Sequence, residues 1–429
     1  MSKQIKVAIV GAGPAGIYAG NILSNQYPDV EIDLFDSLPA PYGLIRYGVA
    51  PDHPRIKGIV NSLHEMLNDG KIRFYGNVTF GTDLTLEDIK KHYHAVIFAT
   101  GAIKDAQLNI PGIGLDGSYG AADFVAWYDG HPDYPRNWPL EAKQVAVLGN
   151  GNVALDVARV LAKHADDLLS TDIPANVYEG LKSSPVTDVH VFGRRGPANI
   201  KFTPIELREL GEEEDVDIVL YEKDFPDGWF DEDAEGVTNQ HKVMARILDS
   251  WRERELTGAS RRLHLHFYST PVEILGDEKV SGIKFQRTGT DEFFEQEVQA
   301  VYRAIGYFGS ALPQIPFDEK LGVITNQGGR VADGIYATGW IKRGPVGLIG
   351  HTKSDATETI ENLVADIPNL VDPIAPGEAI KTLTERGVQF TDWHGWLKLN
   401  AHEQSLGEKV NRERIKVVDR DEQVRISRA

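Results

Sequence analysis

Cysteine is absent from the 429 residues of this chain. Its absence excludes disulfide bonds, cysteine-ligated zinc or iron–sulfur centres, and catalysis by a thiol. It also excludes the dithiol reductases, which need a redox-active cysteine pair. We expect no resident metal ion.

An excess of positive charge and long apolar runs are also missing. The chain carries 63 acidic and 45 basic residues, for a formal net charge of −18, which argues against binding to nucleic acids or anionic membranes. No uncharged apolar run approaches the roughly 18 residues that indicate a transmembrane helix. The first apolar strand begins by Ile5 or Val7, so we expect no targeting peptide and a cytoplasmic protein without membrane insertion.

The first apolar strand leads directly into a glycine-rich turn. Residues 7–10 are all apolar, as in a strand buried on both faces of a parallel sheet, and the sequence GAGPAG follows at 11–16. Gly11 permits a tight turn, Gly13 lets the backbone approach a pyrophosphate, and Gly16 lets the next helix pack against the strand. The N-terminus of that helix adds N–H groups and a partial positive charge. This pattern predicts a dinucleotide-binding fold.

The expected second strand, residues 31–35, ends in Asp36, 25 positions after Gly11. A carboxylate at this place accepts ribose hydroxyls and repels a 2′-phosphate. The first site is therefore predicted to hold FAD or NAD; the alternative is a solvated residue at a strand end. The loop at 39–54 is too apolar for an ordinary surface connection. We expect it to cover a flat ring system, although a structured loop without a ligand is the other interpretation.

A second unit of strand, glycine-rich turn and helix begins about 140 residues after the first such unit. Residues 144–159 read QVAVLGNGNVALDVAR, and this repetition indicates two separate dinucleotides. The partner strand at 188–192 ends in Gly193, Arg194 and Arg195. Guanidinium groups at the ribose end bind a 2′-phosphate bidentately. This site is predicted to hold NADP; a solvated arginine pair is the alternative.

The helix that begins near Thr203 leaves two interpretations open. Thr203, Pro204 and Glu206 have the spacing of a capping box with proline in the first turn. Glu206 and Glu209 also suit carboxylates that face a nicotinamide ring. The sequence pattern alone favours neither interpretation.

One basic stretch stands out in this acidic chain. We predict that it docks an acidic protein, although a solvated helix face has the same composition. Its cations are Lys242, Arg246, Arg252, Arg254, Arg261 and Arg262.

Together these stretches resemble the adrenodoxin reductase-like ferredoxin–NADP reductases over almost the full length. The resemblance is carried by GAGPAG (11–16), PAPYGLIRYGVAPDHPRIK (39–57), GNGNVALDVAR (149–159), GRRG (193–196), FTPIELREL (202–210) and GWIKRGPVGLIG (339–350). It implies FAD in the first site and NADP(H) in the second. It also implies a monomer that passes hydride to the flavin and then single electrons to a ferredoxin-type iron–sulfur protein. The alternatives are a flavin-dependent NADPH oxidoreductase or monooxygenase with a small-molecule acceptor, and a non-catalytic nucleotide-binding subunit.

The resemblance also implies roles for individual residues. His53 and Glu209 match positions near the reacting rings, where they would manage protons. Asp36 stands where family members usually have Glu. The FAD site would comprise Gly11, Gly13, Gly16, Asp36, Leu44, Val78, Trp340, Gly347, Leu348 and Ile349; the NADP site would comprise Asn150, Gly151, Asn152, Val153, Arg194, Arg195, Glu206 and Gly347.

We predict an α/β protein with two Rossmann-like domains, each built on a doubly wound parallel sheet. The FAD domain is discontinuous, with its first part at 1–104 and its second part, including the tail, at 331–429. The NADP domain takes residues 105–330. Single strands are expected at 78–80 and 293–302, and helices at 56–67 and 354–365. The tail from Asp372 has no assigned chemistry.

Overall fold

The computed structural model describes residues 4–346 and 349–429. The chain divides into two compact units. Unit 1 comprises Met1–Lys104, Asp129–Asp133 and Tyr307–Ala429; unit 2 comprises Asp105–Tyr128 and Tyr134–Gly306. The chain thus leaves unit 1 after Lys104, passes through it briefly at Asp129–Asp133, and returns to it at Tyr307, whereas the sequence analysis placed the return at residue 331.

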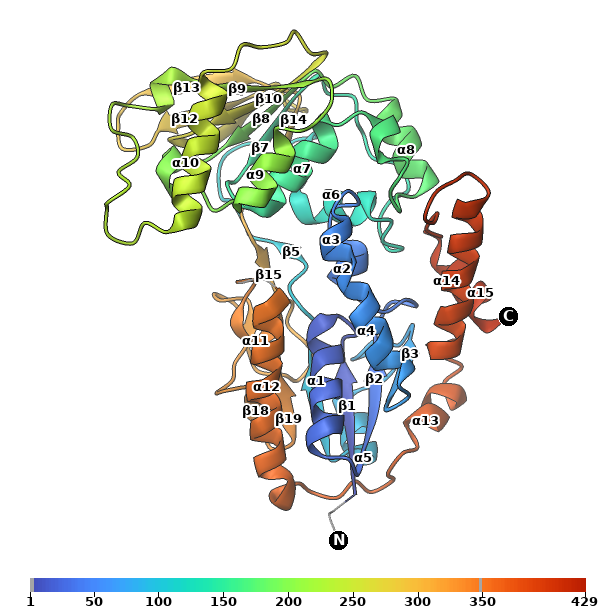
Figure 1. Cartoon of the computed structure of the whole chain (residues 1–429). Coiled ribbons are helices and arrows are strands. Elements are labelled where there is room, and N and C mark those ends of the chain that lie inside the picture. Colours follow the sequence, from blue (N-terminus) through green and yellow to red (C-terminus); the bar gives the residue numbers. More distant parts are fainter. Residues whose placement is uncertain (1–3, 347–348) are drawn as a thin grey trace. The chain divides into compact units, whose positions relative to one another are not determined.

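Within the described residues, unit 1 is built on a seven-stranded sheet of order β18-β19-β4-β1-β2-β3-β20 (Figure 1). The central strands are parallel, and the edge strands β18 and β20 run antiparallel to their neighbours. The strands are β1 (Ile5–Val10), β2 (Val30–Phe35), β3 (Ile72–Gly76), β4 (Ala95–Phe98), β18 (Arg330–Ala332), β19 (Ile335–Ala337) and β20 (Thr391–Asp392). A small sheet pairs β16 (Phe317–Asp318) with β17 (Val323–Ile324).

The helices of unit 1 come from both ends of the sequence. They are α1 (Pro14–Gln26), α2 (Leu44–Tyr47), α3 (Pro54–Lys57), α4 (Ile59–Asn68), α5 (Leu86–His92), α11 (Trp340–Arg343), α12 (Ile349–Asp366), η4 (Ile367–Asn369), α13 (Ala379–Glu385), α14 (Trp393–Glu408) and α15 (Arg420–Arg428). In Figure 1, α12 lies beside α1, although more than 300 residues separate them in the sequence.

The uniformly apolar part of β1, residues 7–10, follows from the place of this strand in the middle of the sheet. Ile5, Val7 and Ile9 belong to a core cluster on one face of the sheet, which includes residues of α1 and α12. Ala8 and Val10 belong to a second cluster on the other face. Because successive side chains alternate between faces, the part of the strand that is covered on both faces is apolar at successive positions.

Unit 2 repeats this plan with different connections. Within the described residues its main sheet has six strands in the order β6-β14-β7-β8-β10-β9, and each neighbouring pair is parallel. An antiparallel sheet of three strands, β11 to β13, is added to it. The strands are β6 (Ser118–Gly120), β7 (Gln144–Leu148), β8 (Asp188–Phe192), β9 (Val216–Leu220), β10 (Arg261–His266), β11 (Ser269–Leu275), β12 (Gly282–Arg287), β13 (Phe293–Glu297) and β14 (Ala300–Arg303).

The helices of unit 2 are α6 (Ala121–Tyr128), α7 (Asn152–Ala162), η1 (Ala165–Leu168), α8 (Ala175–Lys182), η2 (Pro197–Asn199), α9 (Pro204–Leu210), η3 (Glu222–Asp224) and α10 (Asn239–Arg252). Two short strands, β5 (Lys104–Asp105) and β15 (Tyr307–Phe308), lie where the chain passes from one unit to the other. The prediction of an α/β protein with two Rossmann-like sheets is confirmed.

Several expected elements differ in the structure. Residues 78–80 form no strand; Phe80 makes only an isolated bridge to Leu84. The expected strand at 293–302 is two strands, because the alternating and partly exposed β13 suits an outer sheet, whereas the buried β14 suits the centre of a parallel sheet. The expected helix at 56–67 divides at Gly58 into α3 and α4.

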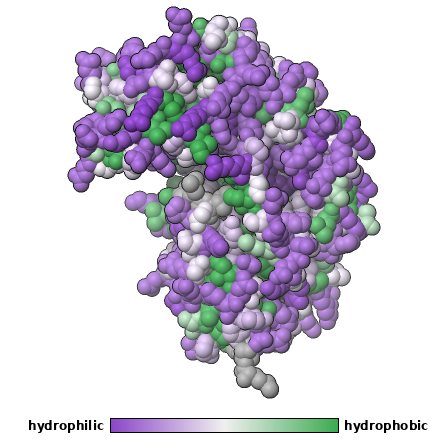
Figure 2. Space-filling view, in the orientation of Figure 1, coloured by the Kyte–Doolittle hydropathy of each residue, from purple (hydrophilic) through white to green (hydrophobic). Residues whose placement is uncertain are grey.

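The surface agrees with the acidic and polar composition. The face shown in Figure 2 is mostly hydrophilic, with scattered hydrophobic groups. In the described part of the chain, none of the helices combines the length and the apolar character needed to cross a membrane.

Candidate functional site

Residues 11–16, the first turn, connect β1 to α1 in unit 1. Gly11 has a φ of +111°, and a Cβ there would overlap the carbonyl oxygen of Ala99, so only glycine fits. The N-cap of α1 is Gly13, which has no side chain to cap the helix. A Cβ on Gly13 would come no closer than 3.8 Å to Gly43. The first N–H groups of α1 are therefore placed to bind an anionic pyrophosphate.

Asp36, directly after β2, is bonded to the first turn. Its Oδ2 accepts the N–H of Ala12 at 2.7 Å, and its Oδ1 accepts the N–H of Leu38 at 2.8 Å. Burial raises the pKa of Asp36 to about 6, against the opposing effect of the two N–H groups. The N–H of Val78 bonds to the carbonyl of Asp36 at 2.8 Å, which places this predicted site residue beside it. The carboxylate of Asp36 thus lies against the first turn.

Residues 37–57, the 37–57 loop, pack against the first turn. The N–H of Tyr42 donates to the carbonyl of Ala12 at 2.8 Å, and a Cβ on Gly43 would lie 2.9 Å from the Cα of Gly13. The predicted site residue Leu44 opens the short helix α2 and is half-buried. His53 is the N-cap of α3 and only 4% exposed. The 37–57 loop thus packs directly against the backbone of the first turn.

Residues 149–154, the second turn, have the same construction in unit 2. Gly149 has a φ of +142°, and a Cβ there would overlap the carbonyl oxygen of Ala304. The N-cap of α7 is Gly151, and a Cβ on it would meet none of the described atoms within 4 Å. The N-terminus of α7 is therefore open to a second pyrophosphate.

Of the other residues predicted for the second site, three belong to this turn and two follow the neighbouring strand β8. The N–H of Lys201 donates to the carbonyl of Asn150 at 3.1 Å, and the N–H of Thr203 donates to Oδ1 of Asn152 at 3.1 Å. Val153, the next residue of α7, is half-buried. Arg194 and Arg195 follow β8 and are exposed to solvent. Exposed guanidinium groups at the end of this strand suit a 2′-phosphate.

The two interpretations of Glu206 are resolved in part by α9. The hydroxyl of Thr203 accepts the N–H of Glu206 at 3.3 Å, so the predicted cap is present. The carboxylate of Glu206 is buried and lies 3.8 Å from the guanidinium of Arg159. The backbone N–H of Thr203 bonds to Asn152 instead of completing the capping box. Glu209 lies one turn after Glu206 and is half-buried.

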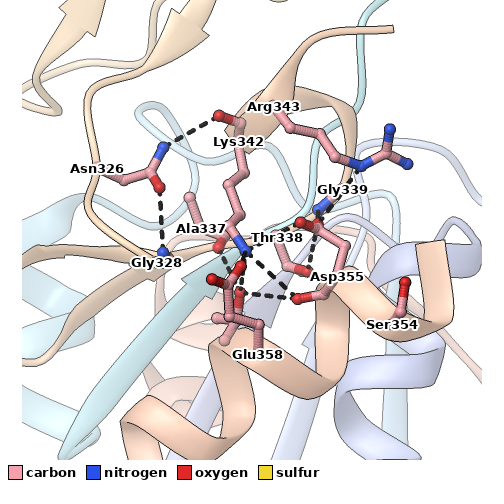
Figure 3. Close-up of polar contacts among 12 residues, drawn as sticks. Asn326, Gly328, Ala337, Thr338, Gly339, Lys342, Arg343, Ser354, Asp355 and Glu358 are labelled. Carbon is pink, nitrogen blue, oxygen red and sulfur yellow. Dashed lines mark hydrogen bonds and ion pairs between the residues drawn. The ribbon is translucent and has the colours of Figure 1, made fainter. Parts of the chain in front are cut away.

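A polar cluster that the sequence analysis missed supports the segment around Trp340 in unit 1 (Figure 3). The carboxylate of Asp355, in α12, accepts the N–H of Gly339 at 2.5 Å and the hydroxyl of Thr338 at 3.2 Å. The ammonium of Lys342 lies 2.9 Å from Asp355 and 2.6 Å from Glu358. Both Lys342 and Asp355 are buried, with less than a tenth of each side chain exposed. These bonds fix the backbone just before Trp340, whose side chain is half-buried.

The remaining predicted FAD residues are only partly described. Gly347 and Leu348 lie outside the described residues. Ile349 opens α12, and its side chain is likewise not described.

Comparison with known proteins gives the family. Residues 5–195 match the model of the pyridine nucleotide-disulphide oxidoreductases. The chain is 38% identical to the NADPH-ferredoxin reductase FprA of Mycobacterium tuberculosis, over 98% of both proteins. It is 36% identical to the mitochondrial NADPH:adrenodoxin oxidoreductase of Arabidopsis thaliana, over 97% of this chain and 94% of that protein. The chain belongs to the adrenodoxin reductase-like family of ferredoxin–NADP reductases.

Solved structures of this family agree. The structure of M. tuberculosis FprA in complex with NADPH superposes with a TM-score of 0.94 over the full length of both chains, at 37% identity. The structure of T. acidophilum thioredoxin reductase matches with a TM-score of 0.50 at 16% identity, which shows a shared fold alone. Cysteine is absent from this reductase-family chain, so the disulphide chemistry in the family model's description does not apply to it.

The predicted docking cations differ in their surroundings. Arg261 is buried, and its Nη1 donates to the carbonyls of Ala162 and Lys163, so it is a core residue of unit 2. Arg252 pairs with Glu222 and Asp249. The exposed guanidinium of Arg262 binds both oxygens of Asp188. Lys242 and Arg246 each lie 4.0 Å from Glu232, and Arg254 is exposed.

Proposed function

We propose that the protein is an NADPH–ferredoxin oxidoreductase that holds FAD in unit 1 and NADP(H) in unit 2. One observation carries the proposal. The two turns have the same construction, but Asp36 is bonded to the first, whereas Arg194 and Arg195 follow the neighbouring strand at the second. A carboxylate repels a 2′-phosphate and guanidinium groups attract it, so the two units select different dinucleotides.

Bound FAD supplies the redox chemistry, because a flavin takes up two electrons as hydride and releases them one at a time. The chain binds and orients the two dinucleotides. The N–H groups of α1 hold the pyrophosphate of FAD, and the carboxylate of Asp36 accepts its ribose hydroxyls. The N–H groups of α7 do the same for NADP(H), and Arg194 and Arg195 hold its 2′-phosphate.

Three further residues act close to the chemistry in this proposal. Glu206 accepts the carboxamide N–H of the nicotinamide through its carboxylate. The carboxylate of Glu209 and the imidazole of His53 hold and move protons. Neither the binding of the carboxamide nor the transfer of protons requires a nucleophilic side chain, which is consistent with the absence of cysteine.

The test is steady-state kinetics of the purified, FAD-loaded protein with NADPH or NADH and a panel of ferredoxins. We expect reduction of a ferredoxin with a strong preference for NADPH. Substrate-dependent oxygen consumption without ferredoxin reduction would indicate a monooxygenase instead. Failure to reduce even ferricyanide would indicate a non-catalytic nucleotide-binding protein.

The electron acceptor in this proposal is an acidic ferredoxin-type protein. Among the predicted docking residues, Arg246 and Arg254 offer exposed positive charge, and Arg261 is excluded by its burial. Replacing Arg246 and Arg254 together with glutamate should raise the KM for ferredoxin, and the increase should be larger at low ionic strength than at high. The rate with ferricyanide should stay unchanged. Lys182→Glu, on the exposed surface of α8, serves as the control. An equal KM for the wild type, the double variant and this control would place the docking surface elsewhere.

A further inference from the structure

Residues 391–429, the C-terminal segment, have no role assigned from the sequence. They form β20, α14 and α15 in unit 1. β20 pairs antiparallel with β3, which attaches the segment to the edge of the sheet. The hydroxyl of Thr391 donates to the carbonyl of Pro39 at 3.0 Å. The segment therefore begins beside the 37–57 loop.

A buried ion pair joins α14 to this loop. The guanidinium of Arg46 donates to both oxygens of Glu403, at 3.0 Å and 2.5 Å. The side chain of Arg46 is 5% exposed and that of Glu403 is 0% exposed. Oε1 of Glu403 also accepts the N–H of Val417 at 3.0 Å. Two charges removed from water are tolerated only when each finds its partner in good geometry, so this pair fixes the loop at Arg46.

A second buried cation, the ammonium of Lys416, bonds to the backbone of the loop at Arg46. The ammonium of Lys416 donates to the carbonyl of Arg46 at 2.9 Å and to the carbonyl of Asp129 at 3.0 Å. The carboxylate of Asp129 lies 3.5 Å from Lys416 and 3.4 Å from Lys57, near the end of the loop. The loop is thus bonded to the C-terminal segment through both the side chain and the backbone of Arg46.

The loop also contains a residue in an unfavourable conformation. Tyr42 has a φ of +84°, which is uncommon for a residue with a side chain. Its hydroxyl accepts the indole N–H of Trp396 at 3.3 Å, and the two rings meet edge to face at 5.6 Å. The conformation of Tyr42 is therefore supported by α14.

Tyr42 and its neighbour are in direct contact with the first turn. The N–H of Tyr42 donates to Ala12, and Gly43 packs against Gly13. Gly13 is the position where the backbone must approach a pyrophosphate. A shift of the loop would thus change the first turn itself.

We propose that the C-terminal segment sets the affinity of the first site for FAD, with Glu403 and Lys416 as positioning residues. They act through Arg46 and the 37–57 loop and do not touch the dinucleotide. This inference rests on the proposed function only in placing FAD in unit 1.

The test uses the full-length protein with Glu403→Gln. The apoprotein is titrated with FAD, and binding is followed by the fluorescence of the flavin. We expect a dissociation constant at least tenfold higher than that of the wild type and a faster release of FAD. The visible circular dichroism of the bound flavin should also change, because the wall of its site has moved. Glu422→Gln, which removes an exposed carboxylate from α15 in the same segment, should leave all three measurements unchanged.

The affinity for NADP⁺ reports on unit 2 and should stay within twofold of the wild type. An unchanged FAD constant in Glu403→Gln, even with a lower melting temperature, would overturn the inference, because the pair would then support only the fold. An equal loss of FAD and NADP⁺ affinity would overturn it as well. Lys416→Met provides the same test if Glu403→Gln does not fold. Wild-type protein that binds no FAD would instead refute the proposed function.

Discussion

Asp36 accepts the backbone N–H of Ala12 at 2.7 Å, so the acidic residue after β2 is bonded to the turn that follows β1. Its other oxygen accepts the N–H of Leu38. Each carboxylate oxygen thus accepts one N–H within the protein and has a further lone pair with which it can accept another hydrogen bond. The same side chain therefore shapes the first turn and offers it an acceptor.

Asp36→Ala should weaken FAD binding. The variant loses an ionised hydrogen-bond acceptor, and such bonds contribute about 1.5–3 kcal/mol, which corresponds to a roughly 10- to 100-fold higher dissociation constant. Fluorescence titration of the apoprotein measures this constant. Asp69→Ala, at an exposed carboxylate of unit 1, is the control. Equal affinity in both variants would remove Asp36 from the binding site.

Replacing Arg194 and Arg195 with glutamine should reduce the preference for NADPH over NADH. A charge-assisted contact with the 2′-phosphate contributes about 1.5–3 kcal/mol, so kcat/KM for NADPH should fall at least tenfold. The value for NADH should change little, because NADH has no 2′-phosphate. The ratio of the two kcat/KM values is the measurement. If the ratio is unchanged, the second site does not discriminate through these residues.

Both turns could be predicted from the sequence because their determinants are local. Gly11 and Gly149 each follow an apolar strand directly, and their positive φ and close approach to a neighbouring strand require glycine. Asp36, Arg194 and Arg195 could be placed because they end the next strand of each unit. The burial of Arg261 could also be predicted. Arg261, Leu263 and Leu265 are two positions apart in β10, so their side chains lie on the same face of the strand.

The supporting contacts could not be predicted because they join distant segments. Arg46 and Glu403 are 357 positions apart, and no local spacing connects them. Lys342 and Asp355 are closer in sequence, but they lie on different helices, α11 and α12, and no local spacing predicts that these helices bring them together. The composition of residues 78–80 predicted a strand. In the structure the N–H of Val78 instead donates to the carbonyl of Asp36.

Asp355→Ala should destabilise unit 1. The substitution leaves the N–H of Gly339 without this acceptor and removes one of the two carboxylates beside the buried ammonium of Lys342. Breaking a buried ion pair costs about 3–5 kcal/mol, and we expect the lower end because Glu358 remains. Denaturant unfolding of the apoprotein measures the change. Glu358→Gln, at a mostly exposed side chain, should cost less than about 1 kcal/mol.

The stability of unit 2 should fall as the pH decreases from 6.5 to 4.5, because three histidines are buried together. His190 hydrogen-bonds with His266 at 3.0 Å, and His264 stacks on His190. Burial lowers the pKa of His190 to about 3, and it also lowers the pKa values of His264 and His266. Folding thus disfavours the protonated form of each ring, whereas each binds a proton near pH 6.5 in the unfolded chain. Their contribution to stability is thus complete above pH 6.5 and is lost below it, since acid favours the state that binds more protons.

His190→Phe tests this pH dependence, because the ring still stacks on Phe192 but no longer titrates. One proton fewer should reduce the slope of the unfolding free energy against pH by up to about 1.4 kcal/mol per pH unit in this range. Denaturant unfolding at pH 6.5, 5.5 and 4.5 gives the slope. His351→Gln, at an exposed position in α12 of unit 1, should leave it unchanged. A wild-type slope in the His190→Phe variant would show that acid unfolding begins elsewhere in the molecule.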